Sequence, residues 1–121
     1  MIRTAADFEA FKASALDWQR RLGLTDWTLH FRFDETTTES DRFANIQLHR
    51  TCRQAALTFY ANLHPDGCLV PVPRQALHEV LHVLLCDVLA VTAARASDDH
   101  AEVVLAEHSA IERLLNALAP V

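Results

Sequence analysis

The most constraining feature of this chain is an apolar run, residues 75 to 91, that carries three ionisable side chains. A helix built from this run has hydrophobic side chains on nearly all sides, which is typical of an interior helix. His78, Glu79 and His82 lie within it. Burying such groups costs free energy unless hydrogen bonds, opposite charges or a metal ion compensate them. The rest of the chain must therefore supply a partner for them.

The spacing of these three residues, His-Glu-x-x-His, indicates what the partner is. His78 and His82 are one helical turn apart on the same face, so both imidazoles can reach a single divalent ion. Glu79 lies beside them, where it can accept a proton from a metal-bound water. We therefore predict a zinc site. The alternative is a pair of core histidines that donate hydrogen bonds to backbone carbonyls, with Glu79 at the rim of the core.

A catalytic zinc needs a third protein ligand, and the C-terminal segment offers one. Glu107 falls near the middle of an apolar stripe predicted for a last helix over residues 98–118, with Ser97 as its N-cap. A carboxylate at such a position is costly unless it is paired or bound to metal. Two antiparallel helices would place it opposite the histidine pair. The stripe consists of Val103, Val104, Ala110, Ile111, Leu114, Leu115 and Leu118.

Two other assignments remain open for this part of the site. Glu107 can instead form a salt bridge to a buried arginine, Arg53 or Arg74. Cys86 lies one turn after His82 and is a minor rival for the third ligand position, although buried cysteine is common as simple packing. His108, at the edge of the stripe, can orient a ligand or contact a substrate.

With these residues in place, the chain resembles the gluzincin branch of the zincin metallopeptidases, in particular minimal single-domain members such as the phage-type zincin-like proteins. The resemblance rests on His-Glu-x-x-His in one helix and a glutamate in the next. It implies that His78, His82 and Glu107 bind zinc and that Glu79 acts as general base or acid. The chain has no third histidine at the spacing of the metzincin branch.

Length and composition fit a single domain spanning residues 1–121, rich in apolar residues and with only 2 glycines. The net charge of −5 argues against binding to nucleic acid phosphates. No membrane-spanning segment or secretory leader is expected. The three cysteines lack CxxC spacing and are typical of reduced thiols, which favours a cytoplasmic location.

The N-terminal two thirds predicts one helix and three strands. The helix is expected from Ala5 to Leu22, with Thr4 as its N-cap. Alternating hydrophobicity predicts strands over residues 27–33, 43–49 and 55–61, the first two separated by a polar, mobile loop over 34–42. The element order is then α-β-β-β-α-α. We expect an α+β fold in which a three-stranded antiparallel or mixed sheet packs against helices.

These features predict a zinc-dependent metallopeptidase acting on a peptide or protein substrate. The oxyanion that forms during hydrolysis needs a second electrophile beside the metal. Tyr60 and His108 are the first candidates, and His64 and Arg113 are further ones. The alternative function is a non-catalytic regulatory or assembly module, in which a fourth protein ligand, Cys86 or His108, closes the metal site.

Overall fold

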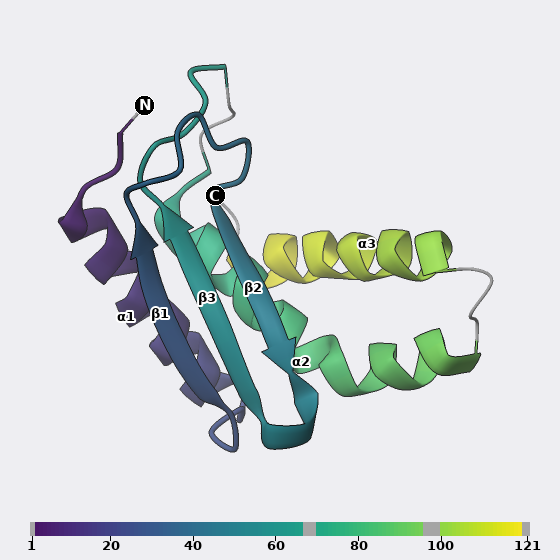
Figure 1. The fold of residues 1–121 in the computed structure, drawn as a ribbon. Coiled ribbons are helices and arrows are strands. Elements are labelled where there is room, and N and C mark those ends of the chain that lie inside the picture. Colours follow the sequence, from purple (N-terminus) through teal and green to yellow (C-terminus); the bar gives the residue numbers. More distant parts are fainter. Residues whose placement is uncertain (1, 67–69, 96–99, 120–121) are drawn as a thin grey trace.

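The computed structural model describes residues 2–66, 70–95 and 100–119. The order of its elements is α-β-β-β-α-α, as predicted, apart from one additional 3-10 turn (Figure 1). The expected Ser97 N-cap lies outside the described residues. The elements are α1 (Ala5–Arg21), β1 (Thr28–Asp34), β2 (Ala44–His49), η1 (Arg50–Cys52), β3 (Gln54–Tyr60), α2 (Val72–Arg95) and α3 (His100–Leu118).

The three strands form one mixed sheet in the order β1-β3-β2. The last strand in the sequence, β3, therefore lies in the centre. It pairs parallel with β1, with Phe31 opposite Leu57, and antiparallel with β2, with Ile46 opposite the same Leu57. Both β1 and β2 are edge strands of the sheet.

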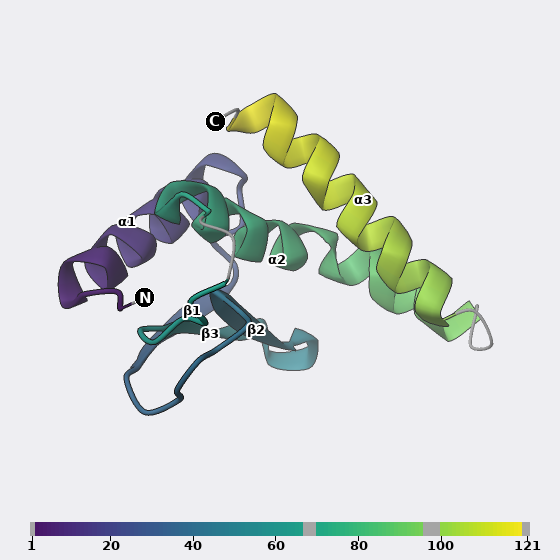
Figure 2. The ribbon, with the colours of Figure 1, turned by 90° about the horizontal axis from the view of Figure 1, so that it is seen from above.

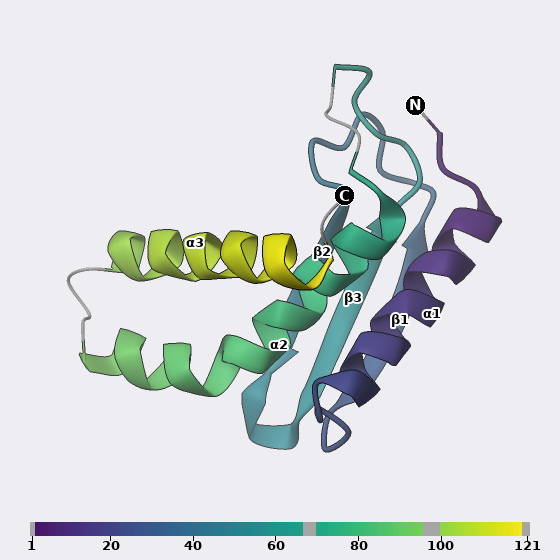
Figure 3. The same cartoon turned by 180° about the vertical axis from the view of Figure 1, so that it is seen from behind.

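The helices gather on one face of this sheet, as Figures 2 and 3 show from above and from behind. α1 and α2 lie directly against the sheet, while α3 lies farther out and packs against α2. The second half of α2 and most of α3 extend past the β2 edge. Within the described residues, no helix covers the opposite face of the sheet, and α2, α3 and β2 come together around one region.

Alternation of side chains along the strands explains which face the helices cover. Ala55, Leu57 and Phe59 of β3 are buried against the helices, whereas the residues between them are more exposed. The core also includes fully buried side chains from each helix, among them Phe11 and Leu81. The core is thus a sandwich of one sheet face and one helical layer.

Polar contacts at the chain connections fix the elements that carry the site. Thr4 caps α1 as predicted: its side chain accepts a hydrogen bond from the Asp7 backbone N–H, while Asp7 Oδ2 accepts the Thr4 N–H at 2.8 Å. Asp87 of α2 accepts hydrogen bonds from Arg50 and from Arg53, at 2.8 and 2.9 Å, which ties the β2–β3 connection to the motif helix.

The loop after β1 begins one residue later than predicted, because Asp34 belongs to the strand. Asp34 is not part of a mobile polar segment but is the last residue of β1, and it is buried. Its carboxylate accepts hydrogen bonds from the backbone N–H and hydroxyl groups of Thr36 and Thr37, at 2.8–3.0 Å. These bonds hold its pKa well below the usual range. They also fix the start of the loop that leads to the edge strand β2.

One helical stretch, Val72–Thr92 within α2, is long and apolar enough by length and composition to cross a membrane. About 44% of this stretch is buried inside the fold. Packing against the sheet and α3 buries part of its apolar surface, while Leu84, Val88 and Val91 are exposed.

Candidate metal centre and cleft

α2 presents the two motif histidines on the side that faces α3 and the β2 edge. Their ring centroids lie 5.1 Å apart, as expected for residues one turn apart on one helical face. Neither ring is exposed, and burial together with the neighbouring imidazoles lowers the pKa of His78 to about 4. His78 is consequently neutral at pH 7, which is the form that binds metal ions.

α3 places two more side chains of types that can bind metal ions, His108 and Glu107, beside the motif histidines. His108 lies on the α2 side of this helix, and its ring centroid is 5.6 Å from that of His82. One nitrogen from each of His78, His82 and His108 fits in a group whose members all lie within 4.8 Å of one another. Glu107 Oε2 lies 3.1 Å from His82 Nδ1, and both side chains are about 15% exposed.

The contacts of Glu107 bear on the salt bridge to Arg53 or Arg74 that the sequence left open. Arg53 pairs with Asp87 and Arg74 with Glu112, so the two arginines considered as partners of Glu107 bind other carboxylates. The glutamate that lies on the core-facing stripe contacts a motif histidine instead. The antiparallel packing of α2 and α3 thus brings His82 and Glu107 into contact, although they are 25 positions apart in the sequence (107 − 82).

Glu79 is the most deeply buried ionisable group of the motif, with 4% of its surface exposed. Its Oε1 accepts a hydrogen bond of 2.7 Å from Gln75 Nε2, one turn earlier on α2. Burial raises the pKa of Glu79 to about 7, against smaller opposing effects of Gln75 and of the Arg42 charge. A carboxyl group with this pKa can both take up and release a proton near neutral pH.

A cleft of about 600 Å³ opens over these side chains. One wall is α2 with Glu79 and the histidines, one is α3 with Glu107 and His108, and the third is the edge strand β2 with the segment before it. Solvent and a ligand can therefore reach the motif. From β2 and the preceding segment, the lining residues are Asp41, Arg42, Phe43, Ala44, Asn45, Ile46 and Leu48.

The predicted site residues do not all reach this cleft. Tyr60 follows the buried Phe59 in β3, so its side chain points to the sheet face that carries no helix. His64 lies in the loop after β3, where its Nδ1 accepts a hydrogen bond from the Asp66 backbone N–H. Cys86 does not line the cleft but an adjoining apolar pocket of about 260 Å³, which shares Leu48 and Glu107 with it. His108 is the oxyanion candidate that does line the cleft.

Several residues that line the cleft were not assigned to the site from the sequence, among them Gln75, Arg42 and Asn45. Gln75 had a signal, because it precedes Glu79 by four residues and so shares its helical face. Arg42 had none, since it comes from a polar stretch without periodicity whose position depends on the tertiary fold. Asn45 lies in the strand predicted over 43–49, but alternation along a strand does not show that its edge lines a cleft. Comparisons with protein-family models, with curated proteins and with solved structures found no match to this chain.

Proposed function

We propose that this protein is a zinc-dependent hydrolase of the zincin-like type that cleaves peptide or amide bonds. The observation that carries the proposal is the position of Glu79. It is a buried carboxyl group with a pKa of about 7, and it adjoins the two motif imidazoles at the base of an accessible cleft. A site with a purely structural metal has no need of such a proton carrier.

His78, His82 and Glu107 are the ligands we assign to the metal. Two imidazoles and one carboxylate are a donor set found in catalytic zinc sites, and it leaves one coordination position open. Glu107 suits this role because it is a largely buried carboxylate in contact with His82. His108 is more exposed, and its Nδ1 lies 3.0 Å from the Val104 carbonyl oxygen of its own helix.

A second possible ligand set consists of three histidines from α2 and α3. Since nitrogens of His78, His82 and His108 lie within 4.8 Å of one another, three imidazoles can also hold a metal. In that case Glu107 accepts the Nδ1–H of His82 and orients its ring, which is a common role for a carboxylate beside a zinc ligand. If all four side chains bind together, the site is closed and the protein is a non-catalytic zinc module.

The chemistry of the protein's own residues follows from the cleft. A bound zinc ion supplies a Lewis acid that lowers the pKa of water. Glu79 takes a proton on its free carboxylate oxygen while the water oxygen forms a bond to the substrate carbonyl carbon. The same proton then passes from Glu79 to the leaving nitrogen as the C–N bond breaks. Gln75 keeps the carboxyl group oriented through its hydrogen bond to Oε1.

Zinc titration of single variants tests the ligand assignment. We expect one zinc per wild-type chain, at least a 100-fold loss of affinity in Glu107→Ala, and less than a 10-fold loss in His108→Ala, because only the former removes a direct ligand. The reverse order supports three imidazoles. A large loss in both variants supports the closed four-ligand site.

Hydrolysis of a fluorescence-quenched peptide mixture tests catalysis. The zinc-loaded wild type should cleave the mixture, and Glu79→Gln should lose at least 100-fold in rate while binding zinc as before, since general acid–base catalysis contributes factors of about this size. Equal rates in the two proteins contradict the proposal. The cytoplasmic location expected from the free thiols Cys52 and Cys86 goes with this proposal.

A further inference from the structure

Arg42 occupies the cleft at the point where the edge strand begins. Its backbone is fixed by Ser40, whose hydroxyl donates to the Arg42 carbonyl at 2.8 Å and accepts the Arg42 N–H at 3.1 Å. The next residue is also fixed, because the Phe43 carbonyl accepts the Tyr60 N–H of the central strand. The side chain of Arg42 therefore starts from a constrained position at the cleft wall opposite α2.

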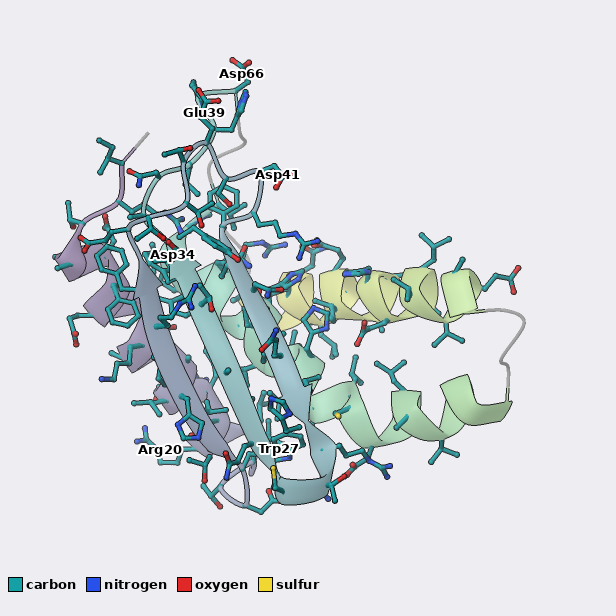
Figure 4. All side chains as sticks on the ribbon, in the orientation of Figure 1. Arg20, Trp27, Asp34, Glu39, Asp41 and Asp66 are labelled. Atoms are coloured by element: carbon teal, nitrogen blue, oxygen red, sulfur yellow. The ribbon has the colours of Figure 1, made fainter. Side chains whose placement is uncertain are left out.

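The charge of Arg42 has no carboxylate partner among the described residues. The only hydrogen bond of its side chain within that part of the chain runs from Nη1 to Asn45 Oδ1, at 3.4 Å. Asp41 lines the same cleft, but its carboxylate lies toward the outside of the loop (Figure 4). By contrast, several other arginines form ion pairs with an aspartate or a glutamate, namely Arg20, Arg21, Arg32, Arg50, Arg53 and Arg74.

The guanidinium of Arg42 and the carboxyl group of Glu79 belong to the same cleft. Arg42 comes from the segment before β2 and Glu79 from α2, which form two of its walls. The intervening space is the cleft itself, since both residues line it. A substrate carbonyl bound over Glu79 would lie between α2 and the β2 edge, within the same space.

We propose that Arg42 is the second electrophile of the site and binds the anionic oxygen that develops on the substrate carbonyl. This inference rests on the hydrolase proposed above. Hydrolysis converts a neutral carbonyl oxygen into an oxyanion, and a positively charged donor beside it stabilises that charge more than it stabilises the neutral ground state. Tyr60 cannot serve, because it faces away from the cleft. The fork of guanidinium donors suits a two-point contact with an anion.

Binding of a tetrahedral anion tests Arg42 without relying on turnover. The probe is an N-phosphoryl leucyl dipeptide amide, whose phosphoryl oxygens resemble the oxyanion, and the matched probe is a mercaptoacetyl leucine amide, which reaches a metal through sulfur. Calorimetric titration of zinc-loaded protein should show that Arg42→Ala binds the phosphoryl probe with 10- to 100-fold lower affinity than the wild type. Its affinities for zinc and for the mercapto probe should be unchanged. The affinity of Arg42→Lys for the phosphoryl probe should lie between those of wild type and Arg42→Ala. Arg20→Ala, which changes an exposed arginine on α1 far from the cleft lining, should match the wild type.

Kinetics on the peptide mixture give a second readout. Arg42→Ala should lower kcat about 100-fold with KM changed less than 3-fold, in keeping with the loss of one oxyanion donor. A change confined to KM overturns the assignment, and so does equal affinity of the phosphoryl probe in wild type and Arg42→Ala. The assignment is also overturned if Arg42→Ala binds zinc but neither probe, because the residue then only shapes the cleft. Failure of the wild type to bind zinc or the phosphoryl probe overturns the hydrolase itself.

Discussion

At the scale of single residues, Glu79 shows how the fold prepares a side chain for proton transfer. The carboxyl group is buried by the same apolar helix that makes α2 a core element, and its single hydrogen bond to Gln75 does not offset that burial. In the metal-free protein its pKa of about 7 lies well above the usual value of 4.5. The site is thus maintained at a cost in stability, which can be measured.

The pH dependence of unfolding checks this cost. Above pH 4.5 the unfolded chain releases the Glu79 proton, whereas the folded protein keeps it up to about pH 7, so Glu79 destabilises the fold increasingly over this window. The free energy of unfolding of Glu79→Gln should therefore equal that of the wild type at pH 4. At pH 8 it should be about 3 kcal/mol larger, on the order of 1.36 kcal/mol per pKa unit. Urea unfolding in EDTA measures the difference. The exposed Glu102→Gln should show no such trend, and a gap that stays constant with pH would falsify the burial argument.

At the scale of elements, local sequence signals located the helices and strands well. The start of α1 was predicted correctly because Thr4 and Asp7 form a capping box that depends only on near neighbours. Strand positions were predicted to within one residue from alternation alone. The motif histidines and Glu107 were found because helical periodicity fixes which side chains share a face.

What local signals could not give is the pairing of distant segments. The central position of β3 depends on which strand edges meet, and nothing in the period of a strand encodes that. Tyr60 was misjudged for the same reason, since its face is set by where the helices pack. Arg42 was missed because a residue in an aperiodic segment acquires its role from the neighbours that folding provides.

The capping box gives a direct test at this scale. Thr4→Ala removes the side-chain acceptor of the Asp7 N–H, and we expect the free energy of unfolding to fall by about 1 kcal/mol. Thr4→Ser keeps the hydroxyl and should remain within about 0.5 kcal/mol of wild type. Guanidinium chloride unfolding measures both. An equal loss in the two variants would show that the methyl group, and not the cap, is what stabilises α1.

At the scale of the whole molecule, the proposed metal joins two helices whose mutual contact is otherwise limited to part of their length. α3 packs mainly on α2 and extends with it beyond the sheet. A ligand that binds only the folded state adds to stability by mass action, about 2.7 kcal/mol at a free concentration 100 times its Kd. Zinc binding should therefore raise the free energy of unfolding in addition to its proposed role in hydrolysis.

Calorimetric melting with and without zinc tests this coupling. At a free zinc concentration 100 times Kd, we expect Tm to rise by about 10 °C over the EDTA-treated protein. His78→Ala, which removes one proposed ligand, should melt at the same temperature in zinc and in EDTA. If zinc leaves the wild-type Tm unchanged while binding stoichiometrically, binding is not confined to the native state.

The central place of β3 also has a consequence for biosynthesis. A nascent chain that ends at Arg53 already contains the sequences of β1 and β2, yet the two do not pair with each other in the finished sheet. Both hydrogen-bonding ladders must wait until residues 54–60 leave the ribosome. A peptide of residues 1–53 should accordingly give a circular dichroism spectrum with at most helical signal from α1, and a strand signal should emerge only in peptides that extend beyond residue 60.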